Sequence, residues 1–245
     1  MEDRQATLQN ISDALERIKK RIEAKLPNAK IAHKSDIGKL LIRADREEIK
    51  LEVNLVGRGT IETPAKMMLC EKAQEMYDTS SVIQIVPLGQ LYGGKICAAL
   101  DRQHPRDLFD IKLLIENEGF VDSIKKGFLL SLCSSDRPIH EVLVPNLQDQ
   151  RQAMENQFTG MSEITFNYDD FEETRRMLIE HIKQSLNDND KAFLLGFNNT
   201  EPDWTYYDFK QFPAVRWKLQ NLKKFKDVDP EKYEQQHKKL IVKLR

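Results

Sequence analysis

The stretch that most constrains the fold is residues 89–115, GQLYGGKICAALDRQHPRDLFDIKLLI. Small and apolar residues recur at helical spacing on both sides of a polar corner that contains Pro105. A proline fits the first turn of a helix, because the N–H that it lacks would have had no partner there. The stretch therefore predicts two helices joined by a tight corner, with charged side chains gathered at and around it.

Three cations near this corner lie where they could act together. Lys95 and Arg102 are seven residues apart, which is two helical turns, so they share one helix face. Arg106 and Asp110 are four residues apart on the next helix, and we expect them to pair. Cations held among carboxylates in this way can clamp a triphosphate. The alternative is a network of surface ion pairs with little effect on stability.

The N-terminal part of the chain mixes helix and strand patterns. Residues 49–55 alternate between apolar and polar side chains, so Lys50, Glu52 and Asn54 are expected to share one face of a half-buried strand. The complete set of expected elements here is a helix over 3–26, strands over 30–34, 39–44 and 48–56, a helix over 64–76 and a strand over 81–86.

After Phe120 helical patterns dominate, and we place a domain boundary there. Residues 1–120 are predicted to form a mixed α/β domain, and residues 121–245 a helical one, so the fold class is α+β. The expected elements are helices over 121–134, 170–186 and 192–197, from Phe212 onward and in the last fifteen residues, a loop from Arg137, and a strand or extended segment over 164–168.

Composition narrows the function classes. The chain has 245 residues, 38 basic and 39 acidic, so no overall positive field attracts nucleic acid, and any such contact must come from a local patch. Three dispersed cysteines fit reduced thiols better than a disulfide framework. Without an apolar run of about 18 residues or a signal peptide, we expect an intracellular, cytoplasmic protein that makes no membrane contact.

Motif searches exclude several catalytic classes and leave two candidate RNA-binding regions. The histidines show no zinc-ligand spacing, and neither Gly-x-Ser-x-Gly nor a P-loop occurs. Aromatic residues between Trp204 and Trp217 alternate with cations that could assist base stacking, although such clusters are more often helical core. The lysines over 223–226 and 238–243 form a better local RNA-binding patch, or a solvated helix face.

The pattern Lys-x-x-Ala-x-x-x-Arg-x-x-x-Arg-Asp-x-x-Asp resembles a signature of the AbiEii/AbiGii nucleotidyltransferase toxin family over at least residues 2–120. Its members are similar to DNA polymerase beta in their catalytic domain and act in bacterial toxin–antitoxin and phage-defence systems. The resemblance implies Mg²⁺-dependent transfer of a nucleoside monophosphate from an NTP to an RNA such as tRNA, with a cognate antitoxin as a further partner. In this sequence it assigns Lys95, Arg102 and Arg106 to the nucleotide phosphates, Asp107 and Asp110 to orienting those cations or touching metal, and Glu52 to metal binding.

One part of the family pattern is missing from this sequence. Active relatives carry a Gly-Gly/Ser motif and an Asp-x-Asp pair upstream of the segment that resembles residues 2–5, and two-metal phosphoryl transfer needs that carboxylate pair. No Asp-x-Asp precedes Glu52 here. We therefore expect this chain to be weak or inactive, through truncation or divergence. The alternatives are a non-catalytic protein on the same fold that binds RNA or an antitoxin, and a nucleotidyltransferase with a small-molecule acceptor.

Overall fold

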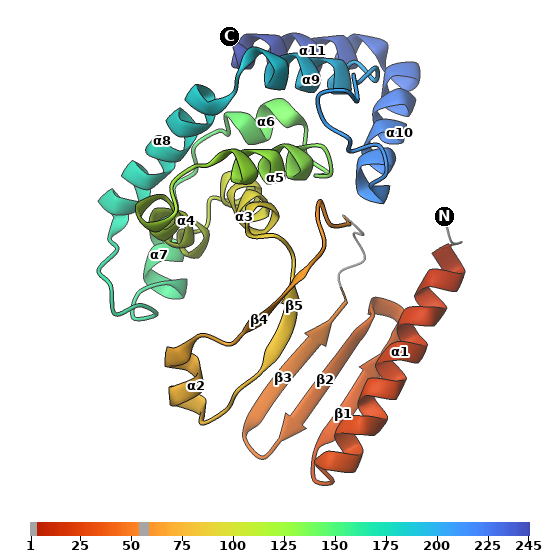
Figure 1. Ribbon diagram of the computed structural model, residues 1–245, viewed down its shortest axis with the longest axis vertical. Helices are drawn as coiled ribbons and strands as arrows, with labels where there is room; N and C mark the ends of the chain where they lie inside the picture. The colour runs from red at the N-terminus through yellow and green to blue at the C-terminus, as the bar shows by residue number, and fades with distance from the viewer. Residues whose placement is uncertain (1–3, 54–58) are drawn as a thin grey trace. The chain divides into compact units, whose positions relative to one another are not determined.

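The computed structural model describes residues 4–53 and 59–245 and divides into two compact units, residues 1–57 and 58–245 (Figure 1). Each unit combines helices with a small antiparallel sheet, which confirms the predicted α+β class. The predicted boundary near residue 120 stays a prediction. It falls inside the second unit, where the helices that precede and follow it pack against each other.

The first unit is one helix on a three-stranded antiparallel sheet of order β1-β2-β3. The first two strands have the bounds predicted from the sequence. The third strand is shorter than predicted, and residues 54–56 of its expected range lie outside the described residues. A short 3-10 helix, Ser35–Ile37, connects β1 to β2, and Gly38 follows it with a positive φ of 60°. The elements are α1 (Arg4–Lys25), β1 (Lys30–Lys34), β2 (Lys39–Ala44) and β3 (Glu47–Glu52).

The core of this unit lies between α1 and the strands β1 and β2. Leu15 of α1 and Leu40 of β2 are almost fully buried, because the apolar face of the helix covers that side of the sheet. The third strand is less covered than its alternation predicted. Ile49 is 62% exposed, since β3 is an edge strand and α1 packs mainly against β1 and β2.

The second unit begins with a strand–helix–strand segment, β4 (Ala65–Met68), α2 (Glu71–Tyr77) and β5 (Val82–Ile85). The predicted helix over 64–76 was wrong for its first half. Alanine, lysine and methionine favour helix, but here Met67 pairs with Ile83 across an antiparallel ribbon. Pairing with a β-branched strand outweighs the local helix propensity.

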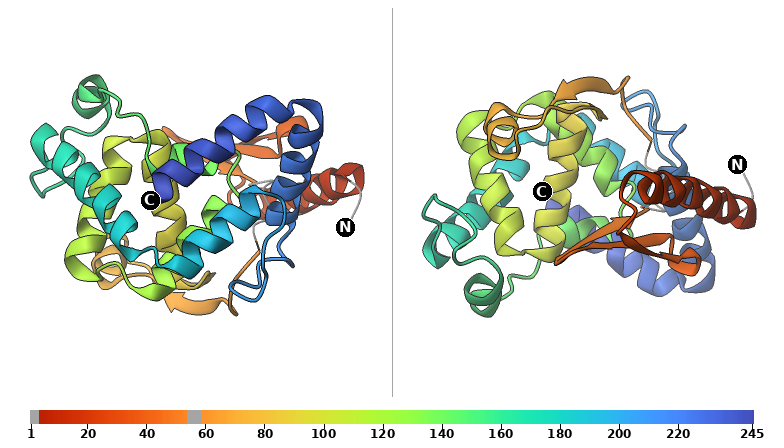
Figure 2. Two further views of the ribbon diagram at one scale, coloured as in Figure 1. Left: turned by 90° about the horizontal axis from the view of Figure 1, so that it is seen from above. Right: turned by 90° about the horizontal axis from the view of Figure 1, so that it is seen from below.

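The rest of the second unit is helical and shares one hydrophobic core. The two helices and the corner predicted over 89–115 are confirmed, with Pro105 in the first turn of α4. Figure 2 shows α9 and α11 side by side, with α10 leading into α11. The helices are α3 (Leu88–Arg102), α4 (Pro105–Asn117), α5 (Asp122–Leu132), α6 (Ile139–Leu143), α7 (Arg151–Gln157), α8 (Tyr168–Ser185), α9 (Asp188–Asn198), α10 (Pro213–Val228) and α11 (Pro230–Leu244).

One expectation for this helical region was wrong, since the loop expected from Arg137 contains the short helix α6. Of the two alternatives for residues 164–168, a strand does not form; the segment leads into α8, and Asn167 has an extended backbone. A capping box fixes the start of α8, since the side chains of Asn167 and Asp170 each accept a hydrogen bond from the other residue's backbone N–H. The core interpretation of the aromatic cluster is confirmed for Phe209 and Phe212, which are buried.

Glycines set how closely α3 and α5 approach. A Cβ on Gly93 would lie less than 3.0 Å from the backbone of Gly127 and Phe128, and one on Gly127 would meet the backbone of Gly89 in the same way. These two helices form the most extensive helix pair in the structure. Gly93, two residues before Lys95, therefore serves helix packing, and α3 has no room for a side chain at that position.

Two buried charged groups connect distant helices. Asp190 of α9 pairs with Lys125 of α5 at 3.1 Å and accepts a short hydrogen bond from the Tyr207 hydroxyl. Lys218 of α10 donates to the carbonyl oxygens of Leu132 and Arg137, at 2.7 and 2.8 Å. Burial lowers the pKa of Lys218 to about 8, although two carbonyl acceptors favour its protonated form.

Candidate functional site

The charged corner between α3 and α4 brings together most of the predicted site residues. Lys95 Nζ donates to Asp110 Oδ2 at 2.5 Å, and Arg102 Nη2 donates to Asp107 Oδ1 at 2.8 Å. Both cations belong to α3 and both carboxylates to α4, so the two pairs bridge the helix hairpin. The sequence argument that Lys95 and Arg102 share a face agrees with this arrangement.

Arg106 differs from the other two cations. The expected pair with Asp110 is absent, because Asp110 pairs with Lys95 across the hairpin. The Arg106 side chain is exposed, and within residues 4–53 and 59–245 it has no carboxylate partner. Its guanidinium is therefore the cation of the corner that can take an anion without first breaking an ion pair. The Lys95–Asp110 and Arg102–Asp107 pairs are partly exposed to solvent, so each contributes about 0–1 kcal/mol to stability.

A buried polar hub, which the sequence did not reveal, lies under the corner. Gln103 is the first of the two residues between the helices, adopts a positive φ of 50° and is 1% exposed. Its side-chain oxygen accepts from Arg175 Nη1 at 3.0 Å and from the Gln148 backbone N–H at 3.1 Å, and its side-chain nitrogen donates to the Asn146 carbonyl. These bonds fix the direction in which α4 leaves α3, and hence where Arg102 stands relative to Arg106.

A shallow cavity of about 360 Å³ opens beside the Lys95–Asp110 pair. Tyr92 and Leu113 supply apolar surface, and Asn117 supplies a side-chain amide. An aromatic ring with a cation and hydrogen-bonding groups offers both stacking and polar contacts to a small ligand. The cavity therefore makes the α3–α4 hairpin the candidate ligand site of the second unit.

Glu52 belongs to the first unit and lies on β3. It forms a short ion pair with Lys39, its partner in the β2–β3 register. The hydrogen bond from Lys39 holds the pKa of the Glu52 carboxyl below its usual value. In the described residues no group of three or more His, Cys, Asp or Glu side chains could hold a metal ion. The carboxylates present there do not by themselves form a Mg²⁺ centre.

Comparison with known protein families identifies the family of this chain. The family described as nucleotidyl transferase AbiEii toxin, Type IV TA system, matches residues 2–221. The chain belongs to this family. Searches of curated proteins and of solved structures gave no match.

Membership agrees with the resemblance seen in the sequence and extends it to residue 221, which lies inside α10. A nucleotidyltransferase toxin implies nucleotide substrates and an antitoxin, and enzymes of this class typically use divalent metals. Helix α11 (Pro230–Leu244) lies beyond the matched residues. Among the helices of the described residues, none is both long and apolar enough to span a membrane.

Proposed function

We propose that this protein is a toxin-type nucleotidyltransferase that transfers a nucleoside monophosphate from an NTP, with Mg²⁺, to an RNA acceptor such as tRNA. It would act in the cytoplasm of a bacterium, in a toxin–antitoxin or phage-defence system with a cognate antitoxin. The observation that carries the proposal is the family match over residues 2–221, with the family's charge signature gathered at one helix corner.

The proposed roles follow from the chemistry of each group. Lys95 contacts the triphosphate, and Arg102 and Arg106 bind phosphate oxygens, for which the planar guanidinium is well suited. Support for Arg106 comes from its exposure and its lack of a carboxylate partner in the described parts of the chain. Glu52 is proposed as the third metal carboxylate.

The chain of residues 1–245 is proposed to be weak or inactive by itself. Two-metal catalysis needs carboxylates that hold both ions, so that the attacking and leaving oxygens are stabilised together. Residues 1–51 contain no Asp-x-Asp motif. A triphosphate would then meet the corner cations without the charge of the metal ions, and would bind weakly.

The test is transfer of label from a set of radiolabelled NTPs into total RNA with Mg²⁺. The 245-residue chain is compared with a version extended upstream in frame. We expect labelling only by the extended version, and loss of labelling in Lys95→Ala. Lys112→Ala is the matched control, because Lys112 is also a paired cation of this hairpin but pairs with Glu116 away from the corner. Labelling by the 245-residue chain would refute the proposed impairment.

A nucleotide-binding measurement, in EDTA and with added Mg²⁺, distinguishes the two proposed roles of Asp110. If Asp110 only orients Lys95, Asp110→Asn frees that cation, and nucleotide binding measured in EDTA becomes tighter. If Asp110 touches metal, binding in EDTA is unchanged and the gain from added Mg²⁺ is lost. Labelling of an aminoglycoside in place of RNA would instead identify a small-molecule acceptor, and binding without labelling would identify a non-catalytic partner.

A further inference from the structure

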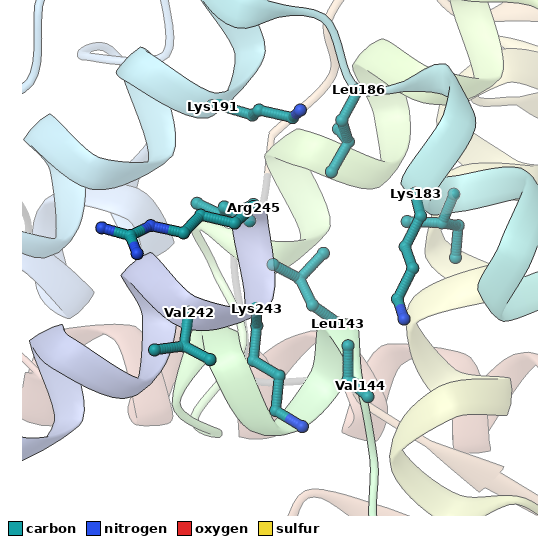
Figure 3. A pocket seen from close by; sticks show the side chains of 10 residues that line it. Leu143, Val144, Lys183, Leu186, Lys191, Val242, Lys243 and Arg245 are labelled. Carbon is teal, nitrogen blue, oxygen red and sulfur yellow. The ribbon is translucent and has the colours of Figure 1, made fainter.

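Two adjoining cavities lie along the C-terminal half of α11. The first, of about 470 Å³, is lined by the ends of α6, α8 and α11 and the start of α9 (Figure 3). The second, of about 390 Å³, reaches from α11 to the end of α3, and includes Asp101 and Gln103 on either side of Arg102. Val144 and Lys243 line both cavities. We call the two together the α11 trough.

The lining of the trough is strongly positive in a chain whose net charge is −1. Six cations face two carboxylates, which leaves four positive charges in excess. Both carboxylates, Asp101 and Glu141, are bound to Arg137. The remaining cations have no carboxylate partner in the described residues; they are Lys183, Lys191, Lys239, Lys243 and Arg245.

Helix dipoles explain only part of this charge. Lys183 and Lys243 lie in the last turns of α8 and α11, where a cation offsets the partial negative charge of the helix end. Lys191 lies near the start of α9, where a cation is unfavourable, and Lys239 lies inside α11. In Figure 3 the side chains of Leu143 and Leu186 lie between the lysine side chains. These lysines, which lack carboxylate partners in the described residues, therefore offer a binding site for an anion.

We infer that the α11 trough binds the sugar-phosphate backbone of the acceptor RNA and leads it to the α3–α4 corner. This inference rests on the proposed function and adds a binding site for its acceptor. Four of the six cations of the trough are lysines, and its lining contains no Phe, Tyr or Trp, which suits sequence-independent phosphate contact more than base stacking. Two of its cations, Lys239 and Lys243, belong to α11, and Arg245 follows that helix; all three lie outside the residues matched by the family.

The test uses the full chain and a fluorescein-labelled single-stranded RNA of about 16 nucleotides, with binding followed by anisotropy from about 50 to 200 mM salt. The trough variant carries Lys191→Gln, Lys239→Gln and Lys243→Gln. Each lost phosphate contact lowers the salt slope by about 0.7, so the slope falls by about 2. We also expect at least tenfold weaker binding at the lowest salt.

The matched control carries Lys34→Gln, Lys66→Gln and Lys232→Gln, which remove the same charge from exposed positions on β1, β4 and α11 that lie outside the trough and outside the lysines over 223–226 and 238–243. We expect its slope and affinity to stay near those of the wild type, and both variants to keep the wild-type far-UV spectrum. Equal loss in both variants, loss in the control alone, or no loss would overturn the inference. So would preferential binding of polyglutamate over RNA, which would indicate an acidic protein partner.

Failure of the inference and failure of the proposed function have different signatures. If the extended wild-type protein labels RNA and the trough variant binds and labels it equally well, the function stands and the trough site fails. If RNA binds in the trough but no protein version transfers label, the site stands and the enzymatic function fails.

Discussion

Substitution of Gly93 by alanine tests whether the close approach of α3 and α5 holds the second unit together. The added methyl group would lie less than 3.0 Å from the backbone of Gly127 and Phe128. Backbone atoms inside two packed helices cannot move aside as the tip of a flexible side chain can. To reach ordinary contact distance, the two helices must separate by about 1 Å.

The expected cost follows from two opposing effects. Overpacking of a well-packed interface costs about 1–3 kcal/mol, and the upper end applies because α3 and α5 form the most extensive helix pair. Alanine in a helix interior gains about 1 kcal/mol over glycine. The free energy of unfolding should therefore fall by roughly 2 kcal/mol, which for a unit of this size lowers Tm by about 4–8 °C.

Gly94 supplies a matched control in the same helix. A Cβ there meets only Ser131 Oγ, at 3.7 Å, which is an ordinary contact. Gly94→Ala should therefore be neutral or stabilising by up to about 1 kcal/mol. Urea unfolding followed by far-UV circular dichroism measures both variants. The steric argument is refuted if the free energy of unfolding of Gly93→Ala lies within about 0.5 kcal/mol of the wild-type value, or if both variants lose equal stability.

The remaining predictions concern the two buried charged groups. Lys218 has a folded-state pKa of about 8, below its ordinary value of 10.5, so the unfolded chain holds the proton more tightly. The free energy of unfolding should therefore rise as the pH increases from 8 toward 10.5, by at most about 3 kcal/mol. Lys218→Met should abolish that rise, and a rise that persists in urea titrations of this variant would contradict the assignment. Asp190→Asn keeps hydrogen-bonding atoms but leaves Lys125 without its buried counter-charge, so it should lower the free energy of unfolding by about 3 kcal/mol. Tyr207→Phe removes one hydrogen bond to a charged group and should cost about 1.5 kcal/mol; a value for Asp190→Asn no larger than this would argue against an ion pair at Lys125.

Sequence patterns correctly predicted the helices and strands whose formation depends on neighbouring residues in the chain. The strands 30–34 and 39–44 match their observed bounds, because alternating residues, turn signals and the covering helix all favour the same pairing. The corner between α3 and α4 was predictable because Pro105 fixes the helix start. The pairs Lys95–Asp110 and Arg102–Asp107 follow once the hairpin exists, since both cations face α4.

Other features depend on contacts between residues far apart in the chain. Residues 65–68 have helix-favouring side chains, and only their pairing with β5 makes them a strand. Gln103 gave no signal in the sequence, because its burial depends on Arg175 of α8 and on a loop more than forty residues away. The pair expected between Arg106 and Asp110 failed for the same reason, since helical spacing alone gave no information about Lys95 across the hairpin.

The net charge of the corner limits how tightly the corner alone could bind a nucleotide triphosphate. The corner has one more positive than negative side chain, because it contains three cations and two carboxylates: Lys95, Arg102, Arg106, Asp107 and Asp110. A triphosphate carries several negative charges, and it must also displace the two carboxylates that already occupy Lys95 and Arg102. Metal ions that neutralise the phosphates would remove this deficit, and two-metal enzymes hold such ions with carboxylates. If the corner is the nucleotide site proposed above, its affinity for a triphosphate therefore depends on the positive charge that metal ions supply.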